Sequence, residues 1–406
     1  MQKRILFISD HGDPLATLGG EQAGGQNNYV KQLSMALSER GHSVDVVTHW
    51  ANADAPKIEH FGENCRVIRV AAGIKGFVEK SDLYSMLPDF YYEMRETLSL
   101  STYDVMHTHY WLSGLLGRKT SLDIGLPWLH TSHSLSVAKQ QATGVSEPKR
   151  RSAEELILET ADSIVATTKT ERKLIRSVTP DPAPIHVIPI GVDETFQPED
   201  TNSSKNTPFF VFAGRLEETK GIYTLIKAFR LLLEQKEIPP SAKLCIAGGD
   251  TYQIDLKRKS PKSRKLQRAI SGIEDYVEFI GPRTQEELSE LFNKATAVIV
   301  PSTYESFGMV AAEAQACGSP VIASEVGGLK DVVKDLETGI HVQKENPAHL
   351  ASAMKFLAMN KDVAQSLGRK AASRARKEFN WSRIAKRMDQ LYEVVAGETQ
   401  AIHVSN

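Results

Sequence analysis

The sequence predicts an α/β protein with two domains, each built around a mainly parallel sheet, that face one another across a cleft. Strand-like apolar runs alternate with helical patterns along the 406 residues, as in layered α/β proteins. This length suits two or three domains. A polar, proline-studded stretch over 180–208 separates two such series and reads as a linker with surface loop. We therefore place the first domain at 1–190 and the second at 191–381.

In the first domain, an apolar run precedes a glycine-rich loop and an amphipathic helix that contains Tyr29 and Leu33. The predicted strands are Ile5–Ile8, Val44–Val47, Asp104–His107, Trp128–Thr131 and Ile164–Thr167.

The second domain repeats the alternation, and no third series of strands is expected after it. Its predicted strands are Phe209–Ala213, Leu244–Ala247, Tyr276–Ile280, Ala297–Val300 and Val321–Ala323. The segment Trp381–Ala396 is predicted as one amphipathic helix, with Ile384, Met388, Leu391, Tyr392 and Val395 on one face.

Composition narrows the classes of function. Forty-nine basic residues against 50 acidic ones give a net charge of −1, so there is no global electrostatic case for nucleic-acid binding. No apolar stretch has the length of a membrane span, and the first apolar run is too short for a signal peptide. The three cysteines show no metal-ligand spacing, so we expect reduced, buried thiols and a cytoplasmic location.

The most informative segment is Pro301–Glu313, which follows a predicted buried strand and leads into a helix. Open α/β sheets bind ligands at the carboxyl ends of their strands. Glu305 on the turn and Glu313 inside the helix suit contacts with two parts of one elongated ligand, such as its hydroxyl groups. A glycosidase would need the two carboxyl groups to face one bond, which an offset of eight residues along a helix makes awkward.

Glycine-rich loops at strand ends indicate a phosphate ligand. Gly24 and Gly25 precede a helix, where unobstructed backbone amides favour an anion. Arg215 and Lys220 flank a second loop and could clamp a diphosphate. Gly327–Gly328 forms a third pair. A flexible turn and solvated cations are the alternatives, but together the loops favour a nucleotide-diphosphate site.

Other polar clusters are weaker signals. His107, His109, His130 and His133 lack further ligands at zinc spacing and are expected to be structural, except that His133 on a strand-end loop is a cleft candidate. The basic run 257–265 is expected to be a solvated loop, with contact to anionic lipid as the minority reading. No Asp-x-Asp is present to hold a metal-bridged diphosphate.

Taken together, these motifs resemble those of the family 4 retaining glycosyltransferases. The segments that carry the resemblance are Gly24–Gln26, Ala213–Arg215 with Lys220, and Glu305–Glu313 followed by Ala314–Pro320. Family members have the GT-B fold, two Rossmann-like domains, and use nucleotide-sugar donors without a catalytic metal or other cofactor. Their last helix returns to the first domain, which implies that 382–406 joins 1–190 as the acceptor-binding domain and that 191–381 binds the nucleotide sugar.

The resemblance also implies residue roles. Arg215 and Lys220 neutralise the donor diphosphate, Glu313 binds the ribose, and Glu305 contacts the transferred sugar. Further donor contacts are implied for Gly24, Gly25, Arg283, Phe307, Gly308, Met309 and Val310. His133 lies beside the sugar and, with Arg215, Lys220 and Glu305, forms the implied catalytic set.

Two groups within the family look most similar: bacterial sucrose-phosphate synthases and the inositol-phosphate N-acetylglucosaminyltransferases of mycothiol synthesis. Both use acceptors that carry a phosphate. The acceptor residues implied by the resemblance are Gln26, Asn27, Lys80, Tyr110, His133, Ser134 and Arg151. Two cations with two hydroxyl groups make a chemically sensible phosphate pocket. The alternative is that Lys80 and Arg151 are ordinary surface charges.

The sequence therefore predicts a retaining, metal-independent transferase that moves glucose or N-acetylglucosamine from a UDP-sugar to a small, phosphorylated acceptor such as an inositol phosphate or sugar phosphate. An unphosphorylated aminocyclitol as acceptor, and a non-catalytic nucleotide-sugar-binding protein, stay open as alternatives. No nucleic-acid partner is expected, and a homodimer is left open.

Overall fold

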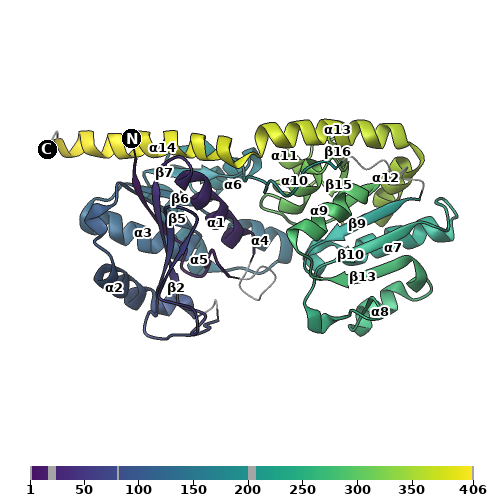
Figure 1. Ribbon diagram of the computed structural model, residues 1–406, viewed down its shortest axis with the longest axis horizontal. Coiled ribbons are helices and arrows are strands. Elements are labelled where there is room, and N and C mark those ends of the chain that lie inside the picture. Colours follow the sequence, from purple (N-terminus) through teal and green to yellow (C-terminus); the bar gives the residue numbers. More distant parts are fainter. Residues whose placement is uncertain (1, 17–23, 80–81, 200–206, 405–406) are drawn as a thin grey trace. The chain divides into compact units, whose positions relative to one another are not determined.

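The computed structural model describes residues 2–16, 24–79, 82–199 and 207–404. The chain divides into two compact units (Figure 1): unit 1 comprises Met1–Gly191 with Trp381–Asn406, and unit 2 comprises Val192–Asn380. These boundaries lie one residue from those expected from the sequence. The cleft expected between the domains stays a prediction.

Unit 1 is built on an eight-stranded sheet with the order β3-β4-β2-β1-β5-β6-β7-β8. The strands are β1 (Arg4–Ile8), β2 (Ser43–His49), β3 (Ile58–Phe61), β4 (Cys65–Val70), β5 (Val105–His109), β6 (Trp128–Thr131), β7 (Ser163–Ala166) and β8 (Ile185–Val187). The pairs run parallel except that β3 is antiparallel to β4. Because β1 pairs with β2 on one side and β5 on the other, the direction of winding reverses between β1 and β5.

Helices cover this sheet: α1 (Gly25–Ser38), α2 (Leu87–Thr97), α3 (Trp111–Ile124), α4 (Ser136–Thr143), α5 (Pro148–Thr160), α6 (Lys169–Val178) and α14 (Trp381–Val404), with short 3₁₀ turns η1 (Leu83–Met86) and η2 (Leu100–Thr102). The C-terminal helix α14 packs against α1 (Figure 1). Its five predicted apolar residues are all buried, which confirms the predicted face. Its return to the first unit is confirmed as well.

Unit 2 contains a six-stranded parallel sheet with the order β13-β10-β9-β14-β15-β16. Its strands are β9 (Phe209–Ala213), β10 (Lys243–Ala247), β13 (Val277–Gly281), β14 (Ala297–Val300), β15 (Val321–Ser324) and β16 (Gly339–Val342), and a small hairpin joins β11 (Ile254–Asp255) to β12 (Ser260–Pro261). The helices are α7 (Ile222–Glu234), α8 (Arg264–Ile270), α9 (Gln285–Lys294), α10 (Met309–Ala316), α11 (Leu329–Val332), α12 (Pro347–Met359) and α13 (Lys361–Glu378), with 3₁₀ turns η3 (Glu218–Lys220), η4 (Thr251–Gln253) and η5 (Glu274–Tyr276). Winding reverses between β9 and β14, as in a doubly wound nucleotide-binding sheet.

Two expectations about the fold are wrong, at least in part. The chain does cross between the units inside the predicted linker over 180–208, at 191–192, but this stretch is not loop throughout, because it contains the edge strand β8 and the buried Ile190 and Phe196. The second series also continues beyond β15, because β16 pairs with β15 along Val321–Ser324. The expected strands otherwise appear, and all three cysteines are buried free thiols as predicted. Within the described ranges, no helix has the length and apolarity to cross a membrane.

Candidate active site

In unit 2, the loops that follow β9 and β14 meet where the winding of the sheet reverses. The backbone N–H of Thr303 donates to the carbonyl of Thr219 at 2.9 Å. Gly221 has a φ of +73°, and a Cβ added there would lie 2.0 Å from the carbonyl oxygen of Pro301. A side chain at this position would therefore separate the loops that carry the predicted donor residues.

Lys220 and Glu305 are brought together by this contact. Nζ of Lys220 lies 2.6 Å from Oε1 of Glu305, and the Ser302 hydroxyl donates to the same oxygen at 3.0 Å. The lysine and glutamate side chains are 23% and 17% exposed, so the pair is partly shielded yet reachable by a ligand. Arg215 lies apart from this pair. Its side chain is 74% exposed and contacts Glu217 at 2.8 Å.

The third predicted glycine pair supports the backbone of Glu305. The N–H of Gly328 donates to the carbonyl of Glu305 at 2.9 Å, and a Cβ on Gly327 would lie 2.0 Å from that same oxygen. The glycines therefore allow the loop after β15 to lie directly against the loop after β14. They fix the position of Glu305 through the main chain.

Helix α10 begins directly after this loop. Gly308 has a φ of +100°, and Phe307 is buried with its ring edge-on to Phe379 at 5.7 Å. Met309 and Val310 are half-buried in the first turn, where helix amides have no partner inside the helix. The first turn thus presents N–H groups beside Glu305, as an oxygen-rich ligand would require.

Glu313 lies one turn further along α10 in a different environment. It is 9% exposed, and burial, followed by the nearby carboxylate of Asp193, raises its pKa to about 7. Glu305 is not among the causes of this shift. The two glutamates therefore occupy separate environments, as the sequence predicts.

Arg283 follows β13 and a turn at Gly281, where φ is +79°. The N–H of Gly248 donates to the carbonyl of Gly281 at 2.7 Å, which joins the ends of β10 and β13. Arg283 Nη1 donates to the carbonyl of Pro282 at 3.1 Å. Its backbone thus lies at the same edge of the sheet as Lys220, two strands away from β9.

In unit 1, the corresponding reversal between β1 and β5 positions the start of α1. Gln26 Nε2 donates to the Ser9 hydroxyl at 3.0 Å and to the carbonyl of His109 at 3.4 Å. Asn27 accepts from the N–H of Gly24 at 3.1 Å and donates to the carbonyl of Asp13 at 2.9 Å. These bonds hold the turn at Gly24 and Gly25.

Gly24 and Gly25 are themselves exposed. No atom of the described residues lies within 4 Å of a Cβ added at either position. Packing against the described residues therefore does not explain these glycines, and a close-approaching ligand would.

Tyr110, directly after β5, adopts an unusual backbone conformation. Its φ of 78° and ψ of 159° fall in a region that is almost restricted to glycine and costs on the order of 1–3 kcal/mol for other residues. Its ring meets His11 edge-on at 4.7 Å and lies under the Arg150 guanidinium at 4.9 Å. Such strain is typical of functional positions.

Arg150, which sequence reasoning missed, completes a cluster with Tyr110 and Ser134. Its Nη2 donates to the carbonyl and hydroxyl oxygens of Ser134 at 2.9 and 3.0 Å, and its Nε donates to Glu154 at 2.7 Å. Only 6% of Arg150 is exposed. Glu154 four residues on, in a helix that begins at Pro148, is the sequence signal that could have identified it.

Of the other two predicted phosphate cations, Arg151 does not join this cluster in the structure. Arg151 Nε donates to Glu155 at 2.8 Å, and its Nη2 donates to the carbonyl of Val178 at 3.5 Å. Lys80 lies outside the described residues.

Three of the four histidines are buried in hydrogen-bond networks. His107 contacts the hydroxyls of Tyr392 and Thr131, both at 2.8 Å, and His130 contacts Thr108 at 2.9 Å. His109 is fully buried and contacts His133, which is half-buried on the loop after β6. No group of three or more potential metal-binding side chains was found in the described part of the chain.

The basic run 257–265 covers the turn after β11, the strand β12 and the start of α8. Most of its residues are exposed, and two of its lysines form surface ion pairs, with Lys259 2.9 Å from Glu278 and Lys265 paired with Glu218. The expected solvated loop is confirmed. Contact with lipid stays a prediction.

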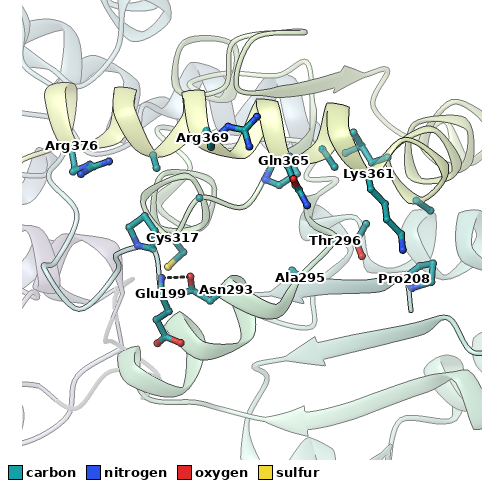
Figure 2. Close-up of a pocket in the computed structure, with 17 residues that line it drawn as sticks. Glu199, Pro208, Asn293, Ala295, Thr296, Cys317, Lys361, Gln365, Arg369 and Arg376 are labelled. Atoms are coloured by element: carbon teal, nitrogen blue, oxygen red, sulfur yellow. Dashed lines mark hydrogen bonds between the residues drawn. The ribbon is translucent and has the colours of Figure 1, made fainter. Parts of the chain in front are cut away.

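A separate cavity of about 600 Å³ lies in unit 2 beneath α13 (Figure 2). Lys361, Gln365, Arg369 and Arg376 lie along the helix, opposite Asn293 and Cys317. The Asn293 side chain accepts from the N–H of Glu199 at 2.9 Å. None of the predicted donor residues lines this cavity, so the candidate site is distinct from it.

Comparison with known proteins identifies the family. Residues 193–374 match the family described as "Glycosyl transferases group 1", and residues 24–191 match "Glycosyl transferase 4-like domain". A D-inositol 3-phosphate glycosyltransferase of Geodermatophilus obscurus is 32% identical, covering 98% of this chain and 91% of that protein. The solved sucrose-phosphate synthase of Thermosynechococcus elongatus is 34% identical with a TM-score of 0.87, covering 98% of this chain and all of that one.

A third structure, Anabaena HepE in complex with UDP-glucose, is 17% identical with a TM-score of 0.70 and covers 97% of this chain and 100% of its own. At this identity the likeness shows a common fold. With both parts of the chain matched and full-length relatives above 30% identity, the chain belongs to the group 1 glycosyltransferases and has their GT-B fold.

Proposed function

We propose that this glycosyltransferase transfers a hexosyl group, glucose or N-acetylglucosamine, from a uridine-diphosphate sugar to a small acceptor that carries a phosphate. The names of the two relatives above 30% identity, D-inositol 3-phosphate glycosyltransferase and sucrose-phosphate synthase, both contain a phosphorylated compound. The proposed reaction retains the anomeric configuration and requires no catalytic metal.

The ion pair of Lys220 and Glu305 carries this proposal. It lies where the winding of the unit 2 sheet reverses, the usual position of a nucleotide in such sheets. In the proposed complex, Lys220 turns from Glu305 to the donor diphosphate and Glu305 accepts hydrogen bonds from the sugar. Arg215 adds a second positive charge. Cations so placed stabilise the charge that develops on the leaving diphosphate, as metal ions do in other transferases.

We propose front-face attack as the route to retention. The acceptor oxygen forms a bond to the anomeric carbon on the face from which the diphosphate oxygen leaves, and that oxygen takes the acceptor's proton. Glu305 accepts a hydrogen bond from Ser302 and, in the proposed complex, from hydroxyls of the sugar, and Glu313 is buried in α10, so neither is assigned as a nucleophile.

The acceptor phosphate is assigned to Arg150 with the hydroxyls of Tyr110 and Ser134. A guanidinium fork suits phosphate, and Arg150 is held in one orientation by Glu154. Its contact with the half-exposed Glu147 is longer, at 3.2 Å, and is the one that a phosphate would replace. Gln26, Asn27 and His133 are proposed to contact the remainder of the acceptor or the reacting sugar.

The test is mass spectrometry of products from pooled uridine-diphosphate sugars offered with phosphorylated and plain cyclitols and sugars, with and without a chelator. A hexosylated phosphate acceptor whose anomeric configuration by NMR matches that of the donor is expected. If an unphosphorylated aminocyclitol is glycosylated as efficiently as the phosphorylated acceptors, the proposal that the acceptor carries a phosphate is wrong. No product with any donor would favour a non-catalytic nucleotide-sugar-binding protein.

A further inference from the structure

The cavity beneath α13 lies at the opposite edge of the unit 2 sheet from the candidate donor site. Pro208, Thr296 and Pro320 line it, and they directly precede the strands β9, β14 and β15. Lys220 and Glu305 belong to the loops that follow β9 and β14, so they lie beyond the other ends of the same strands. The cavity volume of about 600 Å³ is in the range of small-molecule sites. The cavity is therefore large enough for a ligand of its own.

Part of the cavity wall is apolar. Leu357 and Ala358 come from the end of α12, and Ala364 and Ala372 come from α13. The prolines that precede β9 and β15 add further apolar surface. Contact with such a wall favours a ligand that has an apolar body or the apolar face of a ring.

Two arginines of α13 lie along this cavity (Figure 2). Arg369 and Arg376 are separated by about two helical turns and so share one face of the helix. Both residues are exposed, and neither forms a hydrogen bond or an ion pair with another residue of the described ranges. Arg374 of the same helix, by contrast, donates to the carbonyl of Asp331 at 2.9 Å and lies 2.8 Å from Glu378. The guanidinium groups of the two cavity arginines are thus available to a ligand.

The charges around the cavity favour an anionic ligand. Three of the residues that line it are basic, Lys361, Arg369 and Arg376, and one is acidic, Glu199. In Figure 2 the Glu199 carboxylate points away from α13. Gln365, one turn before Arg369, adds an amide that can bind polar groups of a ligand. Guanidinium groups bind phosphate with paired N–H donors, and two of them provide for several phosphate oxygens.

We propose that this cavity is a second ligand site, which binds a small phosphate monoester with an apolar or ring-shaped body. Arg369 and Arg376 bind the phosphate group, and Leu357 and Ala372 contact the body. The site is built from residues of unit 2 alone and shares none of the residues assigned to donor or acceptor, so it does not depend on the proposed function.

Isothermal titration calorimetry of the full-length protein with 1-naphthyl phosphate tests the ligand class. We expect this probe to bind at least about tenfold more tightly than 1-naphthoate or inorganic phosphate, because the carboxylate has fewer acceptor oxygens and inorganic phosphate lacks the apolar body. Absence of binding overturns the proposal. So does an affinity for 1-naphthoate or for inorganic phosphate that equals the affinity for 1-naphthyl phosphate.

Substitutions on α13 test the role of the two arginines. Arg369→Gln and Arg376→Gln should each weaken binding of 1-naphthyl phosphate by about tenfold or more, since each removes hydrogen bonds to a charged group. Lys370→Gln and Lys377→Gln are the matched controls, because these neighbouring lysines are exposed and do not line the cavity. They remove the same charge and should change Kd by less than about twofold. Equal losses in the arginine and lysine variants would show unspecific attraction to the helix and overturn the proposal.

Two further measurements locate the bound probe. In methyl-labelled protein, the naphthyl protons should give nuclear Overhauser effects to the methyl groups of Leu357 and Ala372. Lys220→Ala and Arg150→Lys should leave the affinity for 1-naphthyl phosphate unchanged. If either of these variants abolishes binding while Arg369→Gln does not weaken it, the probe occupies the candidate donor or acceptor residues and the proposal of a second site is wrong.

Discussion

At the residue scale, Lys220 is the side chain on which the proposed chemistry depends most. Its ammonium group is 2.6 Å from Glu305 and less than a quarter exposed, whereas Arg215 extends into solvent. We expect Lys220→Ala to lower kcat by about 10²–10³, the usual effect of removing one donor that stabilises developing negative charge. Steady-state kinetics with the identified donor measure this.

Lys227 is the control for Lys220. It is an exposed lysine on the neighbouring helix α7, so Lys227→Ala changes the net charge equally. Near-normal turnover of Lys220→Ala, or an equal loss in both variants, would contradict the assigned role.

The buried Glu313 leads to a separate prediction about how the free energy of unfolding depends on pH. Burial and then Asp193 raise its pKa to about 7 from a usual 4.5, so the folded state binds this proton more tightly than the unfolded state. Its contribution to stability is therefore full below pH 4.5 and is lost as pH rises through 7. Without nucleotide, the free energy of unfolding of the wild type should fall by roughly 2–3 kcal/mol between pH 5 and 8 relative to Glu313→Gln, which carries no titratable group.

Urea unfolding at several pH values measures that difference. The exposed Glu337 provides the comparison, since Glu337→Gln should leave the pH dependence of the wild type unchanged. Parallel pH profiles for the wild type and Glu313→Gln would show that the carboxyl ionises normally in the fold.

At the scale of the element, α5 separates two adjacent arginines. Successive residues of a helix point about 100° apart, so Arg150 meets Ser134 and Tyr110 while Arg151 meets Glu155. We expect Arg150→Lys to raise the KM for a phosphorylated acceptor by about tenfold or more, because lysine keeps the charge but loses the bidentate fork. Arg151→Lys should leave this KM unchanged.

Lysine is preferred to alanine here because Glu154 is buried beside Arg150, and an unpaired buried carboxylate would destabilise the fold. Acceptor kinetics with phosphorylated and plain substrates measure the effect. If Arg151→Lys raises the KM for the phosphorylated acceptor more than Arg150→Lys does, the phosphate is bound by Arg151, the residue indicated by the sequence.

The arginines illustrate what sequence patterns can determine. Helix α5 is amphipathic and its presence could be predicted, but neighbouring positions are distinguished only by which face packs on α3 and α4. The pair of Lys220 and Glu305 is a similar case. Each residue was identified from its loop, but their contact across 85 positions depends on β9 and β14 being neighbours in the sheet.

The strands also divide into those that the sequence pattern predicts and those that depend on their neighbours in the sheet. Long apolar runs such as β9 and β14 have the predicted bounds, because strands buried on both faces are continuously apolar. The edge strands β3, β8 and β16 were missed because they are short, with a partly polar composition, and depend on pairing with a neighbour. Strand β4 was missed too, because two arginines interrupt its apolar run.

At the scale of the whole molecule, the chain passes between its units twice, at 191–192 and at 380–381. Within unit 2 the two segments are joined, since the N–H of Val192 donates to the carbonyl of Phe379 at 2.8 Å. Within unit 1, Trp381 begins α14 and is 9% exposed, with its ring against Gly191 and edge-on to Tyr29 at 5.7 Å. The contact of Trp381 with Gly191 therefore anchors the first turn of the returning helix.

Replacing Gly191 by alanine should loosen that helix. A Cβ there would lie 2.3 Å from the indole of Trp381, so the ring must move, and such overpacking costs about 1–3 kcal/mol. Hydrogen exchange should then quicken over 384–395, where one face of the helix is buried, and the free energy of unfolding should fall. Gly397→Ala in the same helix is the matched control, because no described atom lies within 4 Å of its added Cβ, and alanine in a helix stabilises by up to about 1 kcal/mol. If the contact of Trp381 with Gly191 holds α14 in place, Gly191→Ala should lower the free energy of unfolding and Gly397→Ala should raise it. A change of the same sign in both variants would show that α14 is held elsewhere along the helix.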